Sequence, residues 1–147
     1  MKAQNMMQID FLSKSSNEGF ARVAIASFAA QLDPTLEEIG DIKTAVSEAV
    51  TNAIVHAYPD CIGKIRIKVR CYEGQILEIV VQDWGIGIED VGKARQPMFT
   101  TGGEDRSGMG FTIMESFMDA LRVRSVPGKG TTVTMKRKIA VRENEMP

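Results

Sequence analysis

A glutamate, an asparagine and a histidine recur at four-residue intervals in the stretch SEAVTNAIVHAY. If this stretch is helical, Glu48, Asn52 and His56 share one stripe, because residues four apart lie on the same face of an α-helix. The adjacent stripe is apolar and comprises Val46, Ala49, Val50, Ala53 and Ala57. A carboxylate and a carboxamide are suited to accept a proton and to bind a metal ion. Two interpretations stay open here, a solvated helix edge and the wall of a polar binding site.

Two polar residues occupy predicted strand positions that face the interior. Side chains alternate across a strand, so Asp83 in ILEIVVQD lies on the same side as apolar residues of its strand, as does Thr131 in GTTVTM. A buried carboxylate requires a hydrogen-bond donor, which either the protein or a ligand supplies. Gly85 and Gly87 follow Asp83 at once, and glycines allow a ligand to approach the backbone closely. These four residues together predict a ligand pocket at one end of a sheet.

A short glycine motif, SGMG, lies at the predicted start of another helix. Around Gly108 and Gly110 the helix would begin with unpaired backbone N–H groups at the positive end of its dipole. Anions bind at such helix starts. Arg106 precedes the motif and is positioned to meet a terminal phosphate. The motif is not a GxxxxGKS/T loop, and it is not a dinucleotide fingerprint because it does not directly follow a strand. An ordinary helix cap at Ser107 with an incidental arginine is the alternative.

These pieces form one site if the helix that carries Asn52 lies over the sheet face that carries Asp83. The Asn52 carboxamide oxygen would then complete a magnesium octahedron that also takes phosphate oxygens. Glu48, one turn earlier, would accept the proton of an attacking hydroxyl group or water. We interpret His56 as a residue of the helix end and not as a participant.

The expected elements follow one another in the order strand, helix, helix, strand, strand, loop, helix, strand, strand. Hydrophobic periodicity and turn residues place them at 6–12, 18–32, 34–57, 63–83 (two strands), 84–108, 109–120 and 121–139 (two strands). Paired strands with no helix between them indicate a mixed, largely antiparallel sheet. Its helices would cover one face, which gives a two-layer α/β (α+β) sandwich.

The first two helices have recognisable start signals. Ser15 and Glu18 have the spacing of a capping box, and Asp33 followed by Pro34 has the pattern of an N-cap and first helical residue. The first helix is expected to bury an apolar stripe formed by Phe20, Val23, Ala24 and Phe28.

Basic residues alternate along the predicted strands and mark the other face of the sheet. They are Lys64, Arg66, Lys68, Arg70, Arg122, Arg124, Lys136 and Lys138. Simple solvation of a half-buried sheet explains this pattern, and a docking surface for an acidic partner is the alternative.

The composition is that of an ordinary globular domain, with 147 residues, 44% hydrophobic residues and a net charge of −1. This charge gives no general attraction to nucleic acid or anionic lipid. The N-terminus lacks the apolar core of a signal peptide, and no apolar run is long enough to cross a bilayer. Cys61 and Cys71 have neither CxxC spacing nor a histidine cluster, which favours reduced thiols over a zinc site. We expect a single cytoplasmic domain over 1–147, with no direct nucleic-acid or membrane partner.

Four short motifs occur in a fixed order along the chain. They are ExxxN (Glu48, Asn52), DxGxG (Asp83, Gly85, Gly87), GxG (Gly108, Gly110) and GT (Gly130, Thr131). This succession resembles the Bergerat-type ATP-binding fold that histidine kinases, DNA gyrase, Hsp90 and the mismatch-repair protein MutL share. Within that superfamily, SEAVTNAIVHAY, ARQPMFTT and RSGMGFTIMESFMD resemble the small serine kinases that double as anti-sigma factors. The resemblance is greatest to the anti-sigma F family of endospore-forming bacteria.

The resemblance implies roles for the individual residues. Asp83 would receive the adenine amino group with the support of Thr131, Asn52 would hold Mg²⁺, and Glu48 would be the catalytic base. The loop over about 91–107 would be the ATP lid, with Arg106 near the γ-phosphate. The phosphates of ATP would be cradled by Gly108, Met109, Gly110 and Phe111.

The resemblance also implies partners. Such a protein forms a homodimer, binds its sigma factor (sigma F) in the ATP-loaded state, and phosphorylates an anti-anti-sigma protein on serine. The first strand and the first helix, including Arg22, belong to none of the four motifs, so we expect them to provide dimer or sigma contacts.

Three other functions fit parts of the pattern. A detached histidine-kinase catalytic domain would need a phosphoacceptor histidine, and His56, the one histidine, lies inside the ExxxN region. A gyrase-like or MutL-like ATPase would carry a transducer domain after the ATP-binding fold. A sigma-binding module with structural ATP and negligible turnover stays possible, although the pairing of Glu48 with Asn52 disfavours it.

Overall fold

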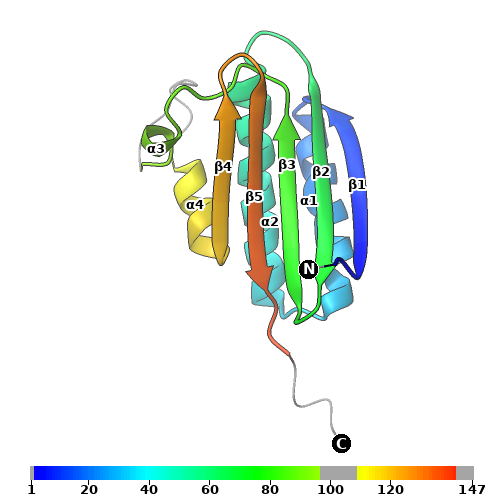
Figure 1. The fold of residues 1–147 in the computed structure, drawn as a ribbon. Helices are drawn as coiled ribbons and strands as arrows, with labels where there is room; N and C mark the ends of the chain where they lie inside the picture. The colour runs from blue at the N-terminus through cyan, green and yellow to red at the C-terminus, as the bar shows by residue number, and fades with distance from the viewer. Residues whose placement is uncertain (1, 97–108, 142–147) are drawn as a thin grey trace, which may run out of the picture.

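The computed structural model describes residues 2–96 and 109–141. The strands form one sheet, and the main helices cover one of its faces (Figure 1). The strands lie in the order β1-β2-β3-β5-β4, and every pairing between them is antiparallel. Their bounds are β1 Asn5–Leu12, β2 Lys64–Tyr72, β3 Ile76–Asp83, β4 Ala120–Val126 and β5 Gly130–Lys138. The predicted two-layer, largely antiparallel fold is confirmed.

The helices of the second layer are α1 Ser16–Ala29, α2 Leu36–Asn52 and α4 Gly110–Phe117. A 3₁₀ turn over Ala30–Leu32 extends α1, and a π-helical turn over Ala53–Ala57 extends α2. The short helix α3 Val91–Ala94 stands apart, after β3. The predicted second helix therefore changes from α to π geometry at its last turn.

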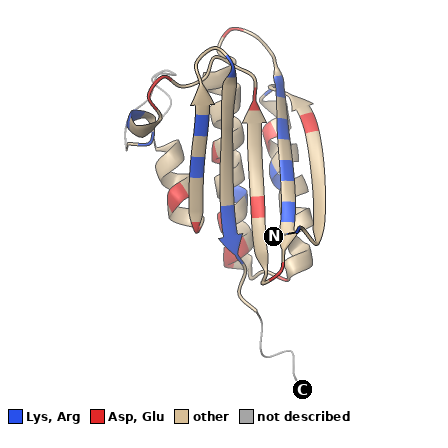
Figure 2. Ribbon diagram, viewed as in Figure 1, with Lys and Arg blue, Asp and Glu red and all other residues tan. Residues whose placement is uncertain are grey.

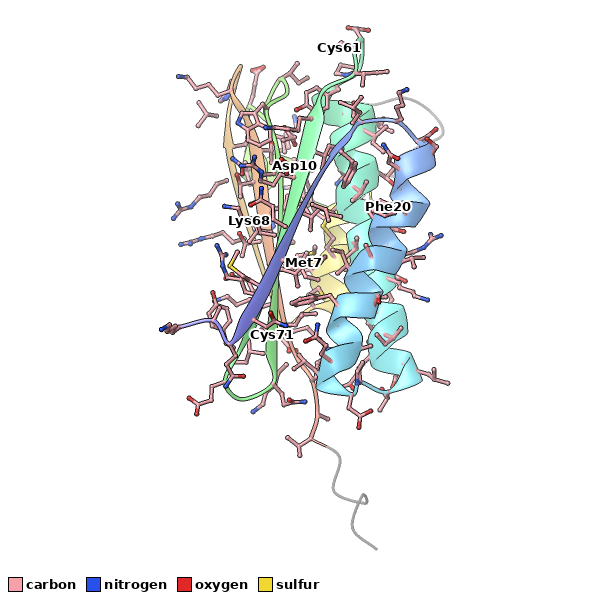
Figure 3. The ribbon with its side chains drawn as sticks, turned by 90° about the vertical axis from the view of Figure 1, so that its right-hand side faces the viewer. Met7, Asp10, Phe20, Cys61, Lys68 and Cys71 are labelled. Atoms are coloured by element: carbon pink, nitrogen blue, oxygen red, sulfur yellow. The ribbon has the colours of Figure 1, made fainter. Side chains whose placement is uncertain are left out.

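Alternation along the strands separates the two faces of the sheet as predicted. In β2 and β3 every second residue is buried, and the residues between them are at least partly exposed. The buried positions join the inner faces of α1 and α2 in one apolar core that includes Ile25, Ile42, Val46, Ile67 and Ile79. Figure 3 shows the sheet edge-on, with α1 on one side and long side chains such as Lys68 on the other.

The buried face of α1 differs from the predicted one. Phe20 and Val23 are 56% and 58% exposed, whereas the fully buried positions are Ala21, Ile25 and Ala29. Residues four apart form this stripe, and its two alanines allow α1 to lie close to its neighbours. The prediction is therefore wrong for Phe20 and Val23, whereas Phe28 is partly buried against the core.

The predicted start signals of both helices also need correction. The Ser15 side chain makes no capping hydrogen bond, because Ser15 has helical and not extended φ/ψ angles, and the Glu18 side chain pairs with Arg22 and accepts a hydrogen bond from Ser47. Helix α2 begins two residues later than expected, with Thr35 and not Asp33 as its N-cap. Thr35 Oγ1 accepts from the Glu38 N–H at 3.1 Å, and the Thr35 N–H donates to Glu38 at 2.9 Å.

The described residues contain no helix long and apolar enough to span a membrane. Cys61 and Cys71 are free thiols, exposed and buried respectively. Burial raises the pKa of the Cys71 thiol, which disfavours the reactive thiolate.

Tyr58 ties together three segments that are distant in the sequence. It follows the π turn, is 8% exposed, and donates its hydroxyl hydrogen to the Lys64 carbonyl at 2.7 Å. The same oxygen accepts from the Trp84 N–H at 2.7 Å. A Cβ on Gly63 would lie 2.2 Å from the Tyr58 ring, so only glycine fits there. The end of α2 is thereby fixed to the start of β2 and the end of β3.

We expect Tyr58→Phe to lower the free energy of unfolding by about 1–3 kcal/mol, because it removes two partly buried hydrogen bonds, one to the Lys64 carbonyl and one from the Trp84 N–H. Urea denaturation of the two proteins measures the difference. Tyr72→Phe is the matched control, since it removes a hydroxyl from Glu78, which Arg70 also holds. An equal loss in both variants would contradict the bridging role of Tyr58.

Candidate functional site

A cavity of about 680 Å³ lies between the last turns of α2, the segment after β3 and the start of α4. Its volume is typical of small-molecule sites. Six of the predicted site residues line it: Asn52, Asp83, Gly87, Gly110, Phe111 and Thr131. Residues that are far apart in sequence thus meet around one space, as the motifs predicted.

Other predicted site residues lie beside the cavity or outside the described structure. Gly85 and Met109 are direct chain neighbours of lining residues but do not line the cavity themselves. Glu48 stands on α2 one turn before Asn52, half-buried, and is also not part of the lining. Arg106 and Gly108 lie outside the described residues, as does the lid segment from 97 to 107.

Asp83 is a buried carboxylate at the end of the central strand, 7% exposed. Its Oδ1 accepts hydrogen bonds from the N–H groups of Gly85 at 3.0 Å and Thr131 at 3.2 Å. Burial raises the pKa of this carboxyl, and the two backbone hydrogen bonds oppose that rise. Among the described residues no hydrogen bond ends on Oδ2. Within the described part of the chain, one carboxylate oxygen is thus satisfied and the other can accept from a donor in the cavity.

Thr131 is held next to Asp83 by its neighbour across the sheet. Ser125 pairs with Thr131 in the register of β4 and β5, and their hydroxyl oxygens are 2.8 Å apart. Ser125 donates its single hydroxyl hydrogen to the Gly130 carbonyl at 3.0 Å and accepts from the Ile88 N–H at 2.7 Å. Thr131 is accordingly the donor to Ser125. The Thr131 hydroxyl oxygen therefore remains available as an acceptor.

The sequence interpretation missed Ser125, although a signal for it exists. Within LRVRSV, Ser125 has the same strand parity as the inward residues Leu121 and Val123. The parity rule that identified Asp83 and Thr131 therefore also marks this serine.

The two glycines after Asp83 serve contacts within the protein. A Cβ on Gly85 would lie 2.2 Å from the Ala57 carbonyl oxygen, which accepts from the Ile86 N–H at 3.0 Å. Gly87 has a φ of +79°, and a Cβ there would lie 2.4 Å from the Val126 carbonyl oxygen. The DxGxG segment is therefore clamped between the π turn and the β4–β5 hairpin. π turns often occur at functional sites.

The start of α4 lies against Asn52. A Cβ on Gly110 would be 3.0 Å from the Asn52 Nδ2 atom and 3.1 Å from its Oδ1 atom. Because Gly110 and Phe111 line the cavity, the first N–H groups of α4 and the positive end of its dipole lie at the cavity wall. The predicted anion site and the predicted metal ligand are thus neighbours.

His56 also lines the cavity, on the π turn. The sequence interpretation treated His56 only as a helix-end residue and did not assign it to the cavity lining.

The donor set suits a ligand with two different ends. An amino group fits the open oxygen of Asp83, and an anionic group fits the N-terminus of α4. The described residues contain no cluster of three or more His, Cys, Asp or Glu side chains that could hold a metal ion. A divalent cation here would be held by Asn52 together with oxygens of the ligand, which is the arrangement that Mg²⁺ commonly adopts.

Comparisons with known proteins show the family to which the chain belongs. The histidine kinase-like ATPase domain family matches residues 14–137. The anti-sigma F factor of Caldanaerobacter subterraneus subsp. tengcongensis is 61% identical over 140 residues, which is 95% of this chain and 97% of that protein. The anti-sigma F factor of Pasteuria penetrans is 54% identical over 144 residues, 96% of this chain and 95% of that protein.

Solved structures share the fold. The RsbU and RsbW domains of a Mycobacterium tuberculosis protein superpose with a TM-score of 0.68 at 18% identity, over 95% of this chain and 34% of that one. The histidine kinase domain of a blue-light activated kinase from Erythrobacter litoralis gives 0.58 at 25% identity, over 83% and 61% of the two chains. The chain therefore belongs to the histidine kinase-like ATPase domain family and, within it, to the family of the anti-sigma F factors.

Proposed function

We propose that this protein is an anti-sigma factor that binds and inhibits a sporulation sigma factor, sigma F, and phosphorylates its anti-anti-sigma antagonist on serine with Mg-ATP. One observation carries the enzymatic part. The open carboxylate oxygen of Asp83 and the Asn52 side chain beside the start of α4 border the same cavity. Relatives at 54–61% identity are anti-sigma F factors, which supports the regulatory part.

ATP would lie across the cavity with its adenine at Asp83. The adenine amino group would donate to Oδ2, and Thr131 would support it directly or through water. The phosphates would meet the backbone N–H groups of Gly108, Met109, Gly110 and Phe111, with Arg106 and the lid over about 91–107 closing on the γ-phosphate. Asn52 would bind Mg²⁺, which neutralises the charge that develops on the phosphate oxygens.

Glu48 would act as the base in the transfer step. The partner's serine hydroxyl would give its proton to the Glu48 carboxylate as its oxygen bonds to the γ-phosphorus and the bond to the bridging oxygen of ADP breaks. Glu48 stands one turn from Asn52, so the base and the metal ligand lie on one edge of α2. Its place outside the cavity lining suits a group that meets the partner's serine and not the nucleotide.

A sigma-binding module with bound ATP and negligible turnover is the second candidate. The position of Glu48 outside the cavity lining favours this candidate, because Glu48 acts only if a partner brings a hydroxyl group to it.

Partners would bind on α1 and β1, outside the cavity. Phe20 and Val23 are exposed on α1, although apolar side chains of this size are usually buried. Arg22 lies between them and is oriented by Glu18 at 3.1 Å and Ser47 at 3.2 Å. Apolar groups around an oriented cation are typical of protein interfaces. The homodimer contacts and the sigma-factor contacts would share this surface. The protein would act in the cytoplasm.

Asp83→Asn tests the adenine site. The amide keeps an oxygen for Gly85 and Thr131 but offers an N–H₂ donor where the ligand's amino group would donate, so ATP affinity should fall at least about tenfold. Isothermal titration calorimetry measures the change. Asp10→Asn, on the outer face of β1, is the control and should bind ATP as the wild type does. Unchanged affinity in Asp83→Asn would place adenine elsewhere.

Glu48→Ala tests the base. Transfer of γ-labelled phosphate from Mg-ATP to the anti-anti-sigma protein should fall about 10²- to 10⁴-fold, while ATP affinity stays within about twofold. Glu37→Ala, in the exposed first turn of the same helix, should transfer at the wild-type rate. If even the wild type transfers no label while it binds ATP tightly, the protein is a nucleotide-gated sigma trap and not a kinase.

Phe20→Ser tests the partner surface. Loss of this apolar group should weaken the complex with the sigma factor about tenfold or more if the side chain is buried on binding. Size-exclusion chromatography and titration of purified partners measure the complex. Leu36→Ser removes a side chain that is 92% exposed elsewhere on the helical layer and should have no effect. Equal behaviour of the two variants would exclude Phe20 from the interface.

A further inference from the structure

The face of the sheet opposite the helices carries a strong excess of positive charge. Figure 2 shows basic residues along β2, β4 and β5 on this side, with few acidic ones between them. We define the outer basic face by Lys64, Arg66, Lys68, Arg122, Arg124 and Lys129. The whole chain has a net charge of −1, so this concentration of cations is local and is not a reflection of composition.

Most of these cations have no partner within the described part of the chain. Arg66 pairs with Asp10 at 2.9 Å, and Glu78 is taken by Arg70 at 3.2 Å. Lys68, Arg122, Arg124 and Lys129 form no ion pair with a described residue. Several like charges held on a rigid sheet without counter-charges repel one another, and an anionic partner relieves that repulsion.

Trp84 gives this face an anchor point. The residue follows Asp83, is 41% exposed, and has the Lys64 Nζ atom 4.6 Å and the Arg66 Cζ atom 5.4 Å from its ring centre. Cations at these distances are attracted to the ring face. Beside Trp84 lies a hollow of about 200 Å³, bordered by Gln82, Arg124, Lys129 and Thr132 and also by the buried residues Asp83 and Thr131. Two cations, an amide and a hydroxyl group around so small a space suit a single carboxylate.

We propose that the outer basic face docks an acidic, extended segment of a partner protein, with one carboxylate side chain in the hollow beside Trp84. Asp83 and Thr131 border both the hollow and the cavity, but their side chains point to the helical side of the sheet, whereas Lys64, Arg66 and Arg124 point away from it. Docking therefore requires no nucleotide and stands independently of the proposed kinase activity.

A nucleic acid fits this surface less well than an acidic polypeptide. Single strands bind by stacking bases on aromatic rings, and the Lys64 and Arg66 side chains already lie over the Trp84 ring.

Fluorescence anisotropy without nucleotide tests the proposal. The probes are a short labelled peptide of glutamate and glycine, its glutamine counterpart, and a single-stranded DNA of equal charge. The wild type should bind the glutamate peptide in preference to both others, and Arg124→Glu should weaken that binding about fivefold or more. Lys14→Glu makes the same change of net charge at an exposed site before α1 and should alter binding less than about twofold.

Arg122→Glu, on the same strand, repeats the test if Arg124→Glu fails to fold, as judged by thermal unfolding. Preferential binding of the glutamate peptide that is lost only in the outer-face variants supports the proposal. No binding by the wild type, tighter binding of the DNA, or an equal loss in Lys14→Glu would overturn it.

Discussion

The carboxylate of Asp83 is buried at the end of the central strand, and its surroundings are built to tolerate it. Two backbone donors, Gly85 and Thr131, satisfy one of its oxygens. For the Thr131 N–H to reach it, β5 must start beside the end of β3, where a Cβ on Gly130 would lie 2.2 Å from the Asp83 carbonyl oxygen. Gly130 also has a φ of +131°, which favours glycine. The close approach of β5 to Asp83 thus requires glycine at position 130, and the N–H of Thr131 supplies a hydrogen bond to the carboxylate.

A second set of contacts fixes the chain that leaves Asp83. The π turn aims the Ala57 carbonyl at the Ile86 N–H, and the Tyr58 hydroxyl receives the Trp84 N–H. Both groups come from the end of α2, the helix that also carries Asn52. The open end of the carboxylate and the carboxamide are therefore positioned by one rigid connection and not by two independent loops. Pre-organisation of this kind lowers the entropic cost of binding a ligand that spans both.

The sequence predicted the sheet better than the helices, and the reason is physical. A strand has a period of two, so alternation in KIRIKVR and ILEIVVQD leaves only two faces to choose from. A helix offers many rotations, and in α1 small residues such as Ala21 and Ala29 allowed close packing while Phe20 stayed outside. The site motifs were visible as residue types at fixed spacings. The π turn was not, because it depends on a tertiary contact between Ala57 and Ile86 that no local pattern encodes.

The same period of two gives the sheet two chemically distinct faces at one strand end. The buried Asp83 side chain turns toward the helices and borders both the cavity and the hollow, whereas its neighbours Gln82 and Trp84 border the hollow alone. A slip of one residue in β3 would bury Gln82 and Trp84 in the helical layer and expose Asp83 to the cations of β2. Such a slip would break the hydrogen bonds of Asp83 and the stacking of Lys64 and Arg66 on Trp84 together. Interactions on both faces therefore select the register that places the carboxylate in the cavity.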